Sequence, residues 1–289
     1  MTRVAKDQKV RALIAAYEQA GLQIASLLMT MLDTYDPGLR VALLRRVTAL
    51  MDAVHAQAET WAGREIPRLY GEEALAQSRP HLSVMLSDLA KARRSVELFA
   101  ARLARQTSLE AEFPELAAIS QSVLGGEAAP RTVAEHIARL LRFRVREDIV
   151  SVIGKDGRAY SFGLGSYAGT VIQSAAMQAQ NSGFLDRARG GGQDLVQVSE
   201  NPSMHGDWCD AYRGRVYSIS GTHPVFPALW RLPNGGPPFH PWCRHDLLVW
   251  RPEGRSRFEI ARVSNTDQRF LLRPGESVNR VAKLWRVGA

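Results

Sequence analysis

Residues 205–245 read HGDWCDAYRGRVYSISGTHPVFPALWRLPNGGPPFHPWCRH. This stretch holds both cysteines of the 289-residue chain, Cys209 and Cys243, and four of its seven histidines. Thiolate and imidazole together form the ligand set that Zn²⁺ selects. The stretch also has a β-rich pattern, because residues 215–218 and 246–250 are predicted strands and a Gly-Gly-Pro-Pro run between them predicts a turn.

A structural zinc site needs four ligands, usually supplied as two close pairs. His205 and Cys209 form one candidate pair, and the second pair would come from His240, Cys243 and His245. Cys243 and His245 are two residues apart and would share one face of a strand, whereas His240 and Cys243 would need a turn. Two other readings stay open, because free buried cysteines are common and the two thiols could form a disulfide in an oxidising compartment.

The same stretch gives little indication of catalysis. Cys209 with His240, or Asp207 with His245, could support a nucleophile or a metal-bound water. The chain nevertheless has no nucleophile elbow, no phosphate-binding loop and no His-Glu-x-x-His helix. We therefore predict a protein that is not an enzyme, and we keep a metal-dependent nuclease or toxin-like enzyme as the alternative.

The chain is basic, with a net charge of +8. More than half of this excess lies in residues 251–289, where nine Arg or Lys face four Asp or Glu. A basic tail is typical of a protein that binds nucleic acid or another anionic surface, although a solvated tail that keeps the protein soluble is an equal alternative. The candidate nucleic-acid ligands are Arg255, Arg257, Arg262, Arg269, Arg273, Arg280, Lys283 and Arg286.

The length of the chain leaves room for one large domain or two ordinary ones with a hydrophobic core. No run of about 18 apolar residues predicts a transmembrane helix, and the N-terminus lacks the apolar core of a signal peptide. Two cysteines do not make a disulfide framework. We therefore expect a protein that is made in the cytoplasm and has no membrane partner.

The first half of the chain has a helical pattern. Apolar residues recur at helical spacing over residues 10–32, 39–70, 82–106, 114–124 and 132–149. Pro67 is expected to bend or end the second of these helices, and residues 125–130 form a predicted linker. A hairpin is predicted over 150–162, a helix over 166–184, a flexible Arg-Gly-Gly-Gly run after it, and a half-buried strand over 195–199.

These patterns predict an α+β chain in three parts. A helical region covers residues 1–165, and a compact α/β unit with the Cys/His cluster covers 166–250. The basic extension, 251–289, is expected to lie along a partner and to become ordered on binding, because its apolar residues are spaced apart as anchors.

The segments DWCDAYRGRVYSISG, HPVFPAL and PPFHPWCRH resemble the C-terminal signature of tailed-bacteriophage minor capsid (minor head) proteins, the group related to the phage Mu head morphogenesis protein. In that family a Cys or His precedes G-(K/R)-V-(Y/F)-S, an S-G-x-x-x-x-(Y/F)-P turn and a closing H-P-N-C-(R/K)-(H/C). The helix before the signature is also similar, so the specific match covers about residues 167–249. The matching positions are Cys209, Gly214, Val216, Tyr217, Ser218, Gly221, Pro227, His240, Pro241, Cys243, Arg244 and His245.

Two residues depart from the family's pattern. Trp242 stands where Asn is usual, and Tyr212 stands where many relatives have a second Cys, which leaves a mixed Cys/His site. The resemblance implies a virion protein present in few copies, associated with the portal protein or the major capsid protein and linked to DNA packaging or ejection. Packaged DNA is a further partner to expect, and a plain nucleic-acid-binding module is the remaining alternative.

Overall fold

A computed structural model describes residues 7–34, 36–71, 74–105, 139–141, 143–153, 157–201, 206–240, 242–243, 245–277, 279–281 and 284. The chain divides into two compact units. The helical unit comprises Ala12–Trp61 and Met85–Val171, and the C-terminal unit comprises Met1–Arg11, Ala62–Val84 and Ile172–Ala289. Long helices and two small antiparallel sheets make up an α+β chain, as the sequence predicts.

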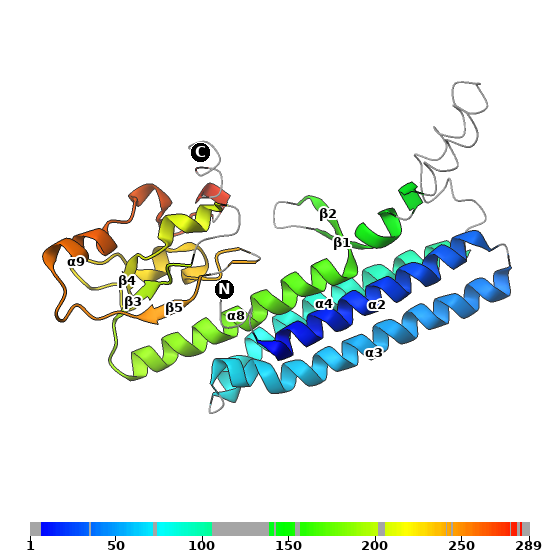
Figure 1. Ribbon diagram of the computed structural model, residues 1–289, viewed down its shortest axis with the longest axis horizontal. Coiled ribbons are helices and arrows are strands. Elements are labelled where there is room, and N and C mark those ends of the chain that lie inside the picture. Colours follow the sequence, from blue (N-terminus) through cyan, green and yellow to red (C-terminus); the bar gives the residue numbers. More distant parts are fainter. Residues whose placement is uncertain are drawn as a thin grey trace, which may run out of the picture. The chain divides into compact units, whose positions relative to one another are not determined.

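The long helices confirm the segments that apolar spacing predicts, although their ends shift by several residues. They are α2 (Gln8–Asp33), α3 (Pro37–Tyr70), α4 (Leu75–Arg105) and α8 (Leu164–Gly190), as Figure 1 shows. Pro67 lies inside α3, and the helix continues past it to Tyr70. A proline removes only one backbone donor, and so close to the end of a helix that loss does not stop the last turn from forming.

Part of the predicted helical region lies outside the described residues. This applies to the helix predicted over 114–124, to the linker predicted over 125–130 and to the start of the helix predicted over 132–149. The described part of that last helix, residues 139–141 and 143–147, is helical as expected.

The helical unit is held together by an apolar core and by an ion pair between two of its helices. Tyr17 of α2, Met51 of α3 and Leu89 of α4 are fully buried. Arg93 of α4 bridges Asp52 of α3 at 2.5 Å, which joins two helices on their partly exposed side. Each of these helices has one apolar face, and burying that face against the neighbouring helices stabilises the unit.

The predicted hairpin is present in the helical unit. Strand β1 (Val150–Ile153) pairs antiparallel with β2 (Ala159–Phe162). The hydroxyl of Ser95 on α4 accepts a hydrogen bond from the Ser151 backbone N–H at 2.9 Å, which fixes the first strand to the helix.

Helix α2 is the one helix among the described residues that is long and apolar enough to cross a membrane by length and composition alone. Helices in the cores of soluble proteins meet the same two criteria. Tyr17, Ile24 and Leu28 of α2 are buried in the protein core. The expectation that the chain has no membrane partner stays a prediction.

Helix α8 is longer than the sequence predicts, since it takes in part of the Arg-Gly-Gly-Gly run. Ala188 is buried in the core of the C-terminal unit, so packing extends the helix to Gly190. Gly192 then has a φ of +69°, and the Gln193 N–H donates to the Ala188 carbonyl at 2.8 Å. This left-handed glycine ends the helix as a C-terminal cap, which explains why the glycines are there.

The C-terminal unit is built on a three-stranded antiparallel sheet. Its strands are β3 (Leu195–Val198), β4 (Val216–Ser218) and β5 (Leu247–Val249), in the order β4-β3-β5. All three confirm strands that the sequence predicts. The central strand β3 is mostly buried, as expected for a strand that is paired on both sides.

The basic segment from residue 251 is not a separate extension in its described part. It forms helix α9 (Arg257–Ser264) and the turn η4 (Gln268–Phe270). Leu271, Leu272 and Val281 are buried in the same core as Val196, Tyr217 and Phe239. The expectation that this segment is ordered only on a partner is therefore wrong for these residues, because its spaced apolar side chains fill the core of the chain's own C-terminal unit.

Candidate metal centre

The two cysteines and His240 come from two segments that the fold brings together. Cys209 lies in the 3₁₀ turn η1 (Trp208–Tyr212), which follows strand β3 in the chain. His240 and Cys243 lie in the loop before β5, where the Cys243 N–H donates to the His240 carbonyl at 3.2 Å. This turn brings the side chains of His240 and Cys243 close together, as predicted for two ligands that are three residues apart.

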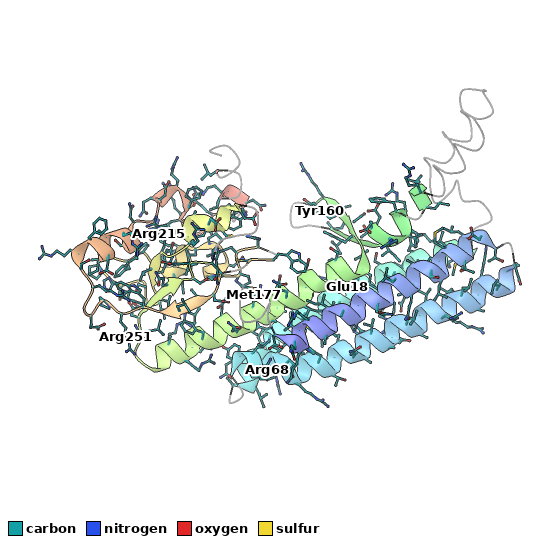
Figure 2. The ribbon with its side chains drawn as sticks, viewed as in Figure 1. Glu18, Arg68, Tyr160, Met177, Arg215 and Arg251 are labelled. Carbon is teal, nitrogen blue, oxygen red and sulfur yellow. The ribbon has the colours of Figure 1, made fainter. Side chains whose placement is uncertain are left out.

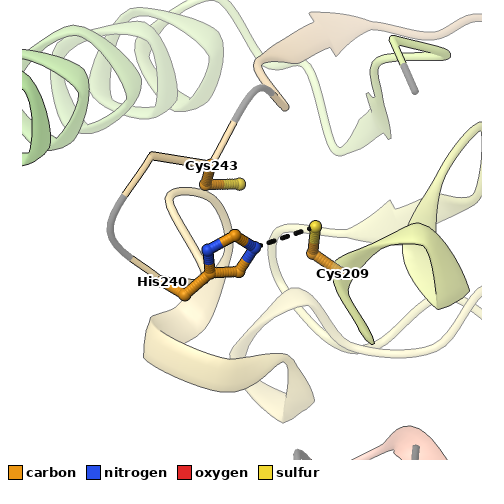
Figure 3. A group of neighbouring side chains, drawn as sticks. All are labelled: Cys209, His240 and Cys243. Carbon is orange, nitrogen blue, oxygen red and sulfur yellow. Dashed lines mark hydrogen bonds between the residues drawn. The ribbon is translucent and has the colours of Figure 1, made fainter. Parts of the chain in front are cut away.

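The ligand atoms of Cys209, His240 and Cys243 all lie within 4.8 Å of one another. Nε2 of His240 is 3.0 Å from Sγ of Cys209, and Figure 3 shows the imidazole turned toward both thiols. Both sulfurs are buried, whereas the imidazole keeps 18% of its surface exposed. Two thiols and one imidazole converging in this way offer three ligands to a soft divalent ion.

The electrostatics of the two thiols favour a shared negative charge. The Cys209 thiol donates a hydrogen bond to Cys243 and so lowers the pKa of Cys243 against the effect of burial, with further help from backbone hydrogen bonds at His245 and Phe239. The same interaction, together with burial, raises the pKa of Cys209. A cation bound between the two sulfurs would favour the loss of their protons.

His245 does not belong to this group, which corrects the predicted ligand set. Cys243 and His245 would share one face only if both lay in a strand. Strand β5 begins only at Leu247, so they do not. His245 is completely buried, and its Nε2 lies 3.7 Å from Oδ1 of Asp210. Burial lowers the pKa of His245 while Asp210 opposes that shift, so the ring is a neutral core residue.

The remaining predicted ligand, His205, lies outside the described residues. Asp207 places a carboxylate beside the group, since its Oδ2 is 4.0 Å from Nε2 of His240 and its side chain is 40% exposed. A fourth ligand position can therefore be taken by a neighbour of Cys209 or by water.

Aromatic rings enclose the group. Trp208 lies 5.5 Å from the ring of His240 and 6.1 Å from that of Phe239. Tyr212, the residue in place of a second family cysteine, packs 4.7 Å from Phe239 and donates from its hydroxyl to the Phe270 carbonyl at 2.7 Å. Tyr212 is thus a core residue that holds the C-terminal segment in place.

No family model, curated protein or solved structure matches this chain. The resemblance to minor head proteins therefore rests on the signature residues alone. Several of these residues have a clear structural role in the fold.

The polar signature residues build the turn after β4. The Ser218 hydroxyl donates to Oδ2 of Asp194 at 2.8 Å and accepts from the Gly221 N–H at 2.9 Å. Partial burial alone would raise the pKa of Asp194, but hydrogen bonds from the Ser220 backbone and from Ser218 outweigh it and lower the pKa. The role of Asp194 could not be predicted from the sequence, because its hydrogen-bond partners lie more than twenty residues further along the chain.

Trp242, the other departure from the family pattern, has a φ of +64°. This left-handed conformation suits Asn, the usual family residue, far better than a bulky side chain, for which it costs about 1 kcal/mol or more. The loop that carries the candidate ligands His240 and Cys243 therefore forces Trp242 into a strained backbone.

We predict that Trp242→Asn leaves the protein at least as stable as the parent. The matched control is Trp230→Asn, because Trp230 is similarly exposed (56% against 46%) but lies in the 3₁₀ turn η2 (Leu229–Arg231). Chemical denaturation should show Trp230→Asn to be about 1 kcal/mol less stable than Trp242→Asn, since only the second change relieves strain. Equal losses in both variants would mean that Trp242 is not strained.

The predicted nucleic-acid ligands divide into two kinds. Arg269 pairs with Asp267 at 2.7 Å, and Arg280 pairs with Glu276 at 3.0 Å, so both have structural partners. Arg255 also has a partner, since it pairs with Glu259 at 3.5 Å. The remaining arginines of the set that the structure describes, Arg257, Arg262 and Arg273, are exposed, whereas Lys283 and Arg286 lie outside the described residues.

Proposed function

We propose that this chain is a structural minor capsid protein of a tailed phage or phage-like particle, with a metal ion that holds its C-terminal unit together. The observation that carries the proposal is the convergence of Cys209, His240 and Cys243, three signature residues, in the packed core of that unit. A metal ion that joins two segments more than thirty residues apart in the chain adds its binding energy to the stability of the folded unit.

The surroundings of the group support a structural role over a catalytic one. The two cysteines are buried in a core that they share with Tyr212, Tyr217 and Phe239. A catalytic metal needs a ligand position open to substrate. The proposed partners are the portal protein or the major capsid protein, with packaged DNA beside them, and the proposed location is the virion.

A metal-dependent nuclease is the second candidate, favoured by the partly exposed Asp207 beside His240. With three protein ligands, a metal ion could keep a water in its fourth position, and a nearby carboxylate could act as a base. This candidate predicts loss of activity without loss of fold when His240 is replaced.

Mass spectrometry of purified DNA-filled particles from the source tests the proposed function. We expect this chain at a low and fixed ratio to the portal protein. Particles treated with nuclease and washed at high salt provide the control for chain that is merely adsorbed. Complete absence of the chain from mature particles, with intact chain free in the lysate, would refute the virion role.

A further inference from the structure

A basic cavity of about 530 Å³ lies in the C-terminal unit, and none of the three metal-group residues lines it. Its charged side chains are three guanidinium groups and one carboxylate, which leaves an excess of two positive charges. The lining residues are Glu200, Arg213, Gly214, Arg215, Arg262 and Val263.

One wall of the cavity is the short turn between η1 and β4. The Gly214 N–H donates to the Val198 carbonyl at 3.0 Å, and the Gln197 side chain donates to the Gly214 carbonyl at 2.9 Å. Gly214 has a φ of +69°, a conformation that few other residues adopt. Arg213 and Arg215 on either side of it therefore project from a backbone that is fixed to the central strand β3.

The opposite wall is helix α9. Val263 is buried in a core cluster with Val216 of β4 and Trp250, so the helix cannot move away from the sheet. The guanidinium of Arg215, labelled in Figure 2, donates to the Arg262 backbone carbonyl and joins the two walls directly. Both walls are thus rigid before any ligand arrives, which lowers the entropic cost of binding.

The positive charges in the cavity are only partly neutralised by the protein. Among the described residues, no carboxylate lies within 4.0 Å of the Arg262 or Arg215 guanidinium, and the nearest to Arg213 is Asp210 at 3.9 Å. Glu200 forms no ion pair with these arginines at that distance, although it lines the same cavity. The guanidinium fork matches the oxygens of a phosphate group, which it can bind through paired, charge-assisted hydrogen bonds.

We infer that Arg213, Arg215 and Arg262 form a phosphate-binding pocket whose ligand is the backbone phosphodiester of duplex DNA. The excess of basic residues around α9 favours a polyanion as the source of that phosphate. This inference rests on the proposed function and specifies its DNA contact. It adds Arg213 and Arg215, which lie outside the basic segment 251–289. Glu200 would weaken the binding, since its carboxylate repels phosphate.

Fluorescence anisotropy with the full chain and a labelled 20-base-pair duplex tests the pocket. At 150 mM NaCl, where charges beyond about 8 Å are largely screened, we expect Arg262→Ala and Arg213→Ala each to weaken binding roughly tenfold. Each should also lower the slope of log affinity against log salt by about 1. Glu200→Gln should strengthen binding.

The matched control is Arg251→Ala, which removes the same charge from an exposed position of the same unit, outside the cavity and outside the predicted nucleic-acid ligands. We expect it to change affinity less than twofold, and circular dichroism confirms that each variant is folded. Equal weakening by Arg251→Ala and Arg262→Ala would overturn the pocket in favour of a diffuse basic surface. A duplex affinity that no pocket variant changes would also overturn it.

Competition with inorganic phosphate at constant ionic strength separates the two sources of phosphate. If 10 mM phosphate does not displace the bound duplex, the result supports the DNA phosphodiester as the ligand. Binding of phosphate alone, lost in Arg262→Ala, would keep the pocket but assign it to a free phosphate and overturn the DNA part. These assays use purified protein, so their outcome is independent of whether the chain is found in particles.

Discussion

Replacing Cys243 by alanine is expected to release a tightly bound metal ion and to unfold the C-terminal unit. Purified parent protein should contain one ion per chain, and the thiolate and imidazole ligands make zinc the expected metal. Structural zinc contributes about 10–16 kcal/mol of apparent binding energy in small zinc domains, which is folding energy for the unit that it closes. Whole domains are stable by only about 5–15 kcal/mol, so loss of a ligand is decisive.

Elemental analysis and thermal denaturation measure the two halves of this prediction. Trp208 packs against the His240 ring, so loss of the metal should change the part of the tryptophan fluorescence that comes from Trp208. Chelation of the parent protein should reproduce the melting of Cys243→Ala, and acidification should release the metal because protons compete for the thiolates. A metal-free parent whose melting is unaffected by chelators would refute the metal centre and leave Cys209 and Cys243 as ordinary buried thiols.

His240→Ala distinguishes a structural metal from a catalytic one. If the metal is structural, this variant melts with the C-terminal unit, whereas in a nuclease the fold would survive and only DNA cleavage would disappear. His223→Ala is the matched control, since His223 lies in the same stretch but outside the metal group. It should retain the metal, although it loses the hydrogen bond that its Nδ1 accepts from the Val225 N–H at 3.1 Å.

The sequence predicts the elements of this fold better than their packing. Helical spacing finds α2, α3, α4 and α8, because each must bury an apolar face whatever its partners are. The segment after residue 250 is different: a basic stretch with isolated apolar residues looks the same whether they bury in a partner or, like Leu271, in the chain's own core. Only the three-dimensional packing separates those two cases.

The candidate site shows the same limit at the level of single residues. Ligand chemistry alone selects Cys209, His240 and Cys243 correctly as a group, because few other functions need those residue types so close together. It also selects His245, since the start of β5 could not be placed to within two residues. The phosphate pocket could not be predicted from the sequence, because Arg213 and Arg262 line the same cavity only once α9 has packed on β4.

The helix contact at Gly183 carries the second large expected effect. A Cβ atom at this position of α8 would lie 1.7 Å from the backbone oxygen of Tyr70, the last residue of α3. The same carbonyl accepts a hydrogen bond from the Arg187 guanidinium, and the Tyr70 hydroxyl donates to Asp186. Gly183→Ala must push the end of α3 away and break both bonds, so we expect a loss of about 3 kcal/mol.

Gly190→Ala is the control for this change, because a Cβ at Gly190 of the same helix would meet no atom within 4 Å. There the ordinary helix preference for alanine applies, and stability should rise by about 0.5–1 kcal/mol. The two substitutions are chemically identical and lie on one helix, yet chemical denaturation should give them opposite signs. A stabilising Gly183→Ala would mean that Tyr70 does not lie against α8, and it would remove the physical reason for a glycine at this position.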